Sequence, residues 1–152
     1  MRLAILAVGH LRGTAEGPLY ENYAKRISQS GRHIGFDGLH LKEIKEHAGA
    51  ADKLRAALKG HRGLVVLLDE TGDNWSSRQF ADRLGGWRDG GRGDILFAIG
   101  PADGFDAEMK AHADVTLSLG RMTWPHMLTR IMLAEQLWRA ISILSGHPYH
   151  RD

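Results

Sequence analysis

Residues 64–69 read LVVLLD, a run of five apolar residues closed by an aspartate. A run this short, bounded by glycine on one side and acid on the other, is typical of a strand buried on both faces of a parallel sheet. Similar apolar runs at 3–8 and 95–99 predict two more buried strands, the second ending at Gly100. Weaker patterns predict strands at 34–41 and 115–119.

Helices are predicted between these strands. They are expected at 19–27, at 50–58, from a Ser76 or Ser77 cap to about Leu84, and near 107–112. Two connections are also expected: residues 69–74 as a polar loop and the glycine-rich residues 85–93 as a surface segment.

The clearest helix is predicted over residues 126–144. Thr123 is expected to cap its start, Gly146 lies where a helix stop belongs, and Glu135 and Arg139 form a favourable i,i+4 pair. Its apolar positions recur at steps of three and four residues: Met127, Leu128, Ile131, Ala134, Trp138 and Ile141.

Alternating short strands and helices predict one α/β domain over residues 1–152, with a parallel or mostly parallel sheet flanked by helices. The chain contains no cysteine, which excludes disulfides, thiolate nucleophiles and cysteine-based zinc sites and fits a reducing cytoplasm. The opening apolar run is too short for a signal peptide or a membrane span, so we expect a cytoplasmic protein with no membrane association. A net charge of +2 gives no broad electrostatic attraction for nucleic acid.

Ligands of open α/β sheets gather at the carboxyl ends of the strands. Here those ends are residues 68–72, 99–104 and 119–126, and glycines there allow close backbone approach to a ligand. No P-loop and no Gly-x-Gly-x-x-Gly motif is present, so nothing is shaped to hold a di- or triphosphate. A nucleoside without phosphates, such as S-adenosylmethionine, is compatible with these loops.

The C-terminal residues 147–151 read HPYHR and are dense in hydrogen-bond donors and titratable groups. Two interpretations stay open: an RNA-binding segment or a frayed terminus. His147 and His150 also have a spacing seen in zinc sites, but with no accompanying carboxylate motif and no cysteine we expect no metal. Trp138 is expected in the core because it lies on the apolar stripe of the last helix.

Several segments together form a recognisable pattern. They are residues 2–9 (RLAILAVG), residues 67–69, Ile99-Gly100 with Gly104, residues 119–126 (LGRMTWPH), then Arg130, Glu135, Trp138 and Arg139-Ala140, and finally residues 147–151. With them, the chain resembles along its full length the RlmH family of ribosomal large-subunit pseudouridine methyltransferases, a small branch of the SPOUT methyltransferases. This chain departs from the family pattern at Pro101, where members usually have glycine. It also departs at Arg121 and Trp124, where small or aliphatic residues are common.

The resemblance implies a C-terminal trefoil knot, a homodimer, and methylation by S-adenosylmethionine of N3 of a pseudouridine in large-subunit rRNA within the assembled ribosome. By position it implies cofactor contacts from Leu68, Gly100, Leu119, Gly120, Arg121, Met122, Thr123 and Trp124. The expected catalytic residues are His126, Arg130, Tyr149, His150 and Arg151.

Within that set His150 is a candidate proton acceptor, Arg130 and Arg151 are candidates to stabilise the anionic base, and Tyr149 to stack on it or donate to it. We expect the tail of one subunit to complete the cofactor pocket of the other. Two alternatives remain at this stage: a ribosome-binding protein that keeps the fold without catalysis, and a methyltransferase for another RNA.

Overall fold

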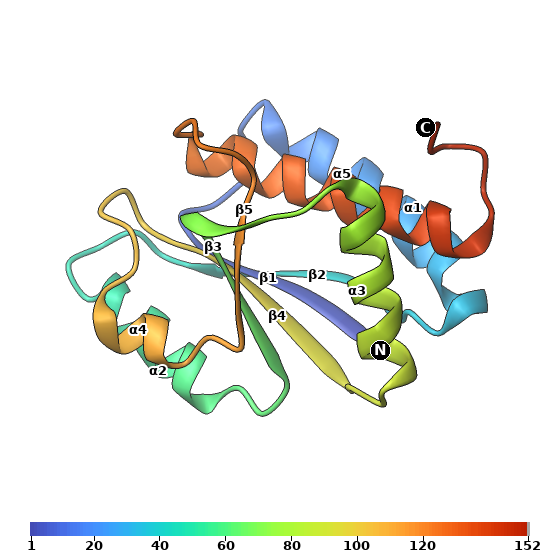
Figure 1. The fold of residues 1–152 in the computed structure, drawn as a ribbon. Coiled ribbons are helices and arrows are strands. Elements are labelled where there is room, and N and C mark those ends of the chain that lie inside the picture. The colour runs from blue at the N-terminus through green and yellow to red at the C-terminus, as the bar shows by residue number, and fades with distance from the viewer. Residues whose placement is uncertain (152) are drawn as a thin grey trace.

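The computed structural model describes residues 1–151 and contains one five-stranded sheet (Figure 1). The strand order is β2-β1-β4-β3-β5 and every neighbouring pair is parallel, which confirms the predicted fold class. The strands are β1 (Arg2–Val8), β2 (Gly38–Ile44), β3 (Leu64–Asn74), β4 (Asp94–Ile99) and β5 (Val115–Ser118).

Helices cover both faces of this sheet. The helices are α1 (Glu16–Gly31), followed by a 3₁₀ turn at Arg32–Ile34, then α2 (Ala50–Gly60), α3 (Ser77–Asp89), α4 (Ala107–Ala111) and α5 (His126–Ser145). Helices α1, α3 and α5 lie on one face, with α1 and α5 side by side, and α2 and α4 lie on the other (Figure 1).

Successive residues of β1 point to opposite faces, as in any strand. Leu3 and Ile5 enter the larger core beneath α1, α3 and α5, whereas Ala4 and Leu6 enter a smaller core beneath α2 and α4. Burial on both faces explains why the central strands are uninterrupted apolar runs rather than alternating ones.

Two predicted elements near the N-terminus have different bounds. The first helix is longer than the expected 19–27, because its packing along α5 stabilises flanking turns that have no apolar pattern of their own. The strand expected at 34–41 begins only at Gly38. Gly35, with a left-handed φ of 88°, ends the 3₁₀ turn, and the fully buried Phe36 enters the core before the strand begins.

The connection expected at 85–93 is wrong for its first part, because α3 continues to Asp89. Gly85 lies inside this helix and faces α5, where an added Cβ would come within 2.9 Å of the Leu144 Cδ2 atom. The glycine therefore permits close helix packing and does not mark a turn.

The start of α3 confirms the predicted serine cap. The Ser76 hydroxyl accepts a hydrogen bond from the Gln79 N–H at 3.1 Å, and the Gln79 side chain accepts one from the Ser76 N–H at 2.9 Å. This is a capping box, which satisfies two N–H groups that the helix cannot.

Replacing Ser76 by alanine should lower the free energy of unfolding by about 1 kcal/mol, because the Gln79 N–H loses its acceptor. Urea denaturation measures the loss. Ser76→Thr keeps a hydroxyl acceptor and is the control; equal losses in both variants would contradict a capping role.

Helix α5 begins at the predicted residue, but the expected Thr123 cap is wrong. Pro125 occupies the N-cap position with φ −55° and ψ 135°, and no described side chain caps the helix. Thr123 lies two residues before this N-cap. The predicted C-terminal stop is confirmed, since Gly146 has a left-handed φ of 71°. Trp138 is 3% exposed, as expected of a core residue, whereas Leu128 is 40% exposed and lies off the buried stripe.

The loop predicted at 69–74 is partly wrong. Asp73 and Asn74 pair with Leu117 and Ser118 of β5, and Leu117 also pairs with Leu68. The four residues 69–72 therefore lie outside the pairing of β3 with β5, which resumes at Asp73. We call residues 69–72 the β3 excursion. No helix among residues 1–151 combines the length and the apolar character needed to cross a membrane.

Candidate functional site

A cavity of about 760 Å³ lies at the carboxyl ends of β3, β4 and β5. Its size falls within the range of small-molecule sites, roughly 300–1,000 Å³. The predicted cofactor residues that line it are Leu68, Gly100, Leu119, Gly120, Met122, Thr123 and Trp124, and the predicted catalytic residue His126 joins them. Arg121 is exposed and is not among the lining residues.

Three chain segments form the walls: the β3 excursion, residues 100–105 and residues 119–125. Gly100 is close to the Phe105 ring, where an added Cβ would lie 3.2 Å from Cε2. Pro101 lacks an N–H, and its carbonyl accepts a hydrogen bond from the Gly104 N–H at 2.8 Å, which closes a turn. The part of the wall between Gly100 and Phe105 is therefore a hydrogen-bonded backbone turn.

Asp69 is the best-anchored carboxylate of the cavity. Thr71 donates to its Oδ1 through the N–H at 2.9 Å and the hydroxyl at 2.6 Å, and the Lys110 ammonium lies 3.1 Å from its Oδ2. Burial raises the pKa of Asp69, but the Thr71 hydrogen bonds and Lys110 outweigh it and hold the pKa below its ordinary value. Asp69 is therefore ionised at neutral pH.

Two further carboxylates, Glu70 and Asp103, line the same cavity. The positive charge of Lys110 is already paired with Asp69. This acidic lining favours a ligand with positive charge and disfavours one that carries phosphates. Met122 and Trp124, at 72% and 41% exposed, leave large apolar surfaces in the solvent beside these acids.

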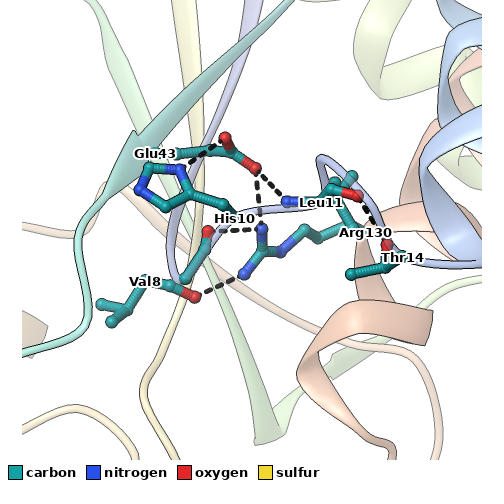
Figure 2. A network of polar contacts seen from close by, with 7 residues as sticks. Val8, His10, Leu11, Thr14, Glu43 and Arg130 are labelled. Carbon is teal, nitrogen blue, oxygen red and sulfur yellow. Dashed lines mark hydrogen bonds and ion pairs between the residues drawn. The ribbon is translucent and has the colours of Figure 1, made fainter.

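Arg130, predicted to be catalytic, is fully buried and does not line this cavity; Figure 2 shows the network that holds it. Its guanidinium donates to the carbonyls of Val8 and Gly9, the latter at 2.9 Å, and lies 3.2 Å from Glu43 Oε1. Burial lowers its pKa and Glu43 opposes that shift. A direct contact with substrate would require this network to open, so the geometry favours a positioning role.

Glu43 completes the network from β2. Its Oε1 accepts the Leu11 N–H at 2.7 Å, and its Oε2 lies 2.9 Å from His10 Nδ1 (Figure 2). One carboxylate thus joins the ends of β1 and β2 to the first turns of α5.

The tail of the chain is docked, which disagrees with a frayed terminus. The Tyr149 ring packs 5.6 Å from that of Trp138, and its hydroxyl donates to Glu135 Oε1 at 3.0 Å. The Arg139 guanidinium lies 5.0 Å from the centre of the Tyr149 ring and also donates to Glu135, which confirms the predicted pair of charges on α5. His150 Nδ1 lies 3.4 Å from Arg139 Nη1.

This docking site lies along the middle of α5, on Glu135, Trp138 and Arg139. At a rise of about 1.5 Å per residue, the nine-residue separation between His126 and Glu135 corresponds to roughly 14 Å along the helix. Within one chain, the structure brings His126 to the predicted cofactor residues, whereas Tyr149, His150 and the exposed Arg151 do not line the cavity.

Replacing Tyr149 by phenylalanine should lower the free energy of unfolding by roughly 1 kcal/mol, because the ring contacts stay and the hydrogen bond to Glu135 is lost. Burial, with Tyr23 and Glu135 nearby, raises the pKa of Tyr149 from 10.0 to about 12. The hydroxyl's stabilisation is therefore complete below pH 10 and is lost as the pH rises toward 12. Urea denaturation of both proteins at pH 8 and pH 11 tests this; a constant difference would contradict it.

Sequence reasoning missed three residues of these sites. Asp69 had a signal, since it directly follows a buried strand, but its partner Lys110 had none. Glu43 was also without a signal, because a single acid on an edge strand is ordinarily a solvated residue.

The chain is similar to known methyltransferases over its whole length. A profile of the family described as "Predicted SPOUT methyltransferase" matches residues 1–150. Proteins named Ribosomal RNA large subunit methyltransferase H are 48% identical in Roseobacter denitrificans, with 100% of both chains covered, and 49% identical in a Ruegeria species, with 99% of both covered. The fold also matches a solved Legionella pneumophila protein described as a methyltransferase with bound SAM, at a TM-score of 0.53 and 13% identity, covering 92% of this chain and 66% of that one.

Proposed function

Because the chain belongs to the SPOUT methyltransferase family, we propose that it methylates N3 of a pseudouridine in large-subunit ribosomal RNA, using S-adenosylmethionine. The observation that carries this proposal is the convergence of Leu68, Gly100 and most of residues 119–124 on one cavity. Relatives nearly half identical over their full length are named for methylation of that RNA, which supports the choice of substrate.

The cavity suits this cofactor in size and charge. When bound, S-adenosylmethionine supplies an activated methyl group on a positively charged sulfonium. With Asp69 paired to Lys110, Glu70 and Asp103 provide the opposite charge, and the absence of phosphates on the cofactor avoids repulsion by them. Backbone groups of Gly100 and of residues 119–124 would hold the adenosine, as glycine-containing loops at strand ends do.

Methyl transfer is an in-line displacement, so the chain contributes chiefly by aligning the reacting atoms. The pseudouridine must lose its N3–H proton, and the base then carries negative charge. His126 and the first N–H groups of α5 stand at the cavity, where a helix N-terminus favours an anion. Arg130 would act on this site by fixing the first turns of α5.

We further propose that the chain works as a homodimer in which the tail of one subunit completes the cavity of the other. Within one chain, Tyr149 is docked on Glu135 and Trp138, and no tail residue lines the cavity. The exposed Met122, Trp124 and Leu128 offer apolar surface for a partner to cover. Tyr149, His150 and Arg151 would then face the base, with His150 as a candidate proton acceptor.

Mixed dimers test this shared site. One subunit lacks residues 147–152, and the other carries Gly120→Val, which places a β-branched residue at a φ of +117°. Each variant alone should be inactive. Co-expressed subunits should recover about a quarter of the wild-type activity, because half of randomly paired dimers contain one intact site of two. No recovery from properly paired dimers would contradict the shared site.

The function itself is tested by mass spectrometry of nucleosides from ribosomes incubated with the protein and S-adenosylmethionine. We expect 3-methylpseudouridine in the large-subunit RNA of intact ribosomes and much less on naked RNA. Equal activity on both would contradict the ribosomal substrate, and methylation of another RNA would replace it. Failure to bind the cofactor in calorimetry would favour a non-catalytic ribosome-binding protein. We also propose that the chain forms a C-terminal trefoil knot and that the protein is cytoplasmic.

A further inference from the structure

The loop between β1 and α1, residues 9–15, lies beside the cavity. Ala7 of β1 pairs with Ile99 of β4, so the loop begins next to Gly100 and Pro101 of the cavity wall. It also approaches α5: a Cβ added to Gly9 would lie 3.8 Å from His126 Nε2. This loop therefore lies at the same end of the sheet as the cavity, next to its β4 wall.

Buried groups hold the loop from beneath. Leu11 is 3% exposed and its N–H donates to Glu43, while the Arg130 guanidinium holds the Gly9 carbonyl. The Thr14 hydroxyl donates to the Leu11 carbonyl at 2.6 Å, and the Thr14 N–H donates to the same oxygen at 3.0 Å. The backbone is thus fixed before any ligand arrives.

Two polar side chains of this fixed loop, His10 and Arg12, are exposed to the solvent. The His10 side chain is 54% exposed, and its Nδ1 lies 2.9 Å from Glu43 Oε2. An ionised carboxylate only accepts hydrogen bonds, so Nδ1 carries a proton and Nε2 is the atom left for a ligand. Arg12 is exposed and forms no hydrogen bond or ion pair with another described residue.

We propose that Arg12 and His10 contact the phosphate backbone of the RNA beside the base that enters the cavity. The proposal rests on the proposed function. The acidic lining of the cavity repels an RNA backbone, so the strand needs cationic contacts at the rim. The Arg12 guanidinium supplies a permanent charge and several donors, and His10 in its imidazolium form donates from Nε2. Because the net charge is only +2, a few placed contacts of this kind carry weight.

The test compares Arg12→Ala and His10→Ala with Arg92→Ala. Arg92 is an exposed arginine just before β4, at the amino-terminal ends of the strands and thus at the opposite end of the sheet from the cavity. Its removal changes the net charge as Arg12→Ala does. We expect Arg12→Ala to raise KM for large ribosomal subunits about tenfold and His10→Ala to raise it less. The kcat and the affinity for S-adenosylmethionine should not change, and Arg92→Ala should match the unaltered protein.

Salt dependence identifies the contact as one with phosphate. The slope of log affinity against log salt should become shallower by roughly one in Arg12→Ala. Arg12→Lys keeps the charge. Its KM and its salt slope should therefore lie close to those of the unaltered protein. An Arg12→Ala variant that matches Arg92→Ala in KM and in salt slope would overturn the proposal.

Filter binding of radiolabelled large subunits separates this proposal from the proposed function, because it needs no turnover. If the unaltered protein binds the particle but transfers no methyl group, the proposed function fails and the Arg12 comparison still decides the contact. If it methylates the RNA and Arg12→Ala binds normally, only the contact fails.

Discussion

Alanine at position 72 should raise the Kd for S-adenosylmethionine at least tenfold, roughly 1.4 kcal/mol, and should lower the free energy of unfolding by about 3 kcal/mol. Gly72 closes the β3 excursion against β5. An added Cβ would lie 2.6 Å from the carbonyl carbon and oxygen of Thr116 and 2.7 Å from the Leu117 nitrogen. These are backbone atoms and cannot rotate away, so β3 and β5 must separate, and both carry walls of the cavity.

Calorimetric titration with the cofactor and urea denaturation measure the two effects. Gly86→Ala is the matched control, because Gly86 lies on an exposed part of α3 with no atom within 4 Å of an added Cβ. That variant should bind normally and gain about 0.5–1 kcal/mol of stability, as alanine does over glycine in a helix. If the two variants behave alike, the close approach of β3 and β5 does not shape the site.

Glu43→Ala should lower the free energy of unfolding by about 3–5 kcal/mol, because it leaves the Arg130 charge buried without its counter-ion. Arg130 has no exposed side-chain surface, and Glu43 is the carboxylate that it contacts. The variant also removes the acceptor of the Leu11 N–H and so loosens the loop beside the cavity. We therefore expect kcat to fall together with stability.

Asp94→Ala is the control, since Asp94 pairs at 2.7 Å with Arg2 in a pair whose side chains are 36% and 58% exposed. Its loss should be below about 1 kcal/mol, as for other surface pairs. Adding Arg130→Met to Glu43→Ala should recover part of the stability, because the unpaired charge is gone. A Glu43→Ala loss no greater than that of Asp94→Ala would contradict this explanation.

The sheet and its order of helices were predictable because strands buried on both faces must be short and apolar. The β3 excursion was not, because the pairing of Asp73 and Asn74 depends on β5, a strand more than 40 residues away in the chain. The continuation of α3 through Gly85 was missed for a similar reason: the contact with Leu144 that favours a glycine there lies on a different helix. Local patterns describe local preference, and these features are tertiary.

The candidate site was predictable only in part from residues. Strand ends indicated where a ligand binds, and the resemblance added residues 119–124 and the tail. Neither indicated that Arg130 is buried against Glu43, since the position of a side chain around a helix decides burial but not its partner. Tyr149 docks on Glu135 and does not line the cavity that His126 lines, which turns the tail from part of one pocket into an argument for two subunits.

The hydrogen bonds of Arg130 have a consequence for how the chain folds. Its guanidinium donates to the carbonyls of Gly9 and Val8, which lie 121 and 122 positions earlier in the sequence. Val8 is the last residue of β1, and β1 also pairs with β4. Contacts between such distant positions form late, because the entropy of closing a long loop must be overcome first. During synthesis, the contacts at the carboxyl end of β1 must therefore wait until α5 has left the ribosome, so the first strand is completed by the last of the described helices.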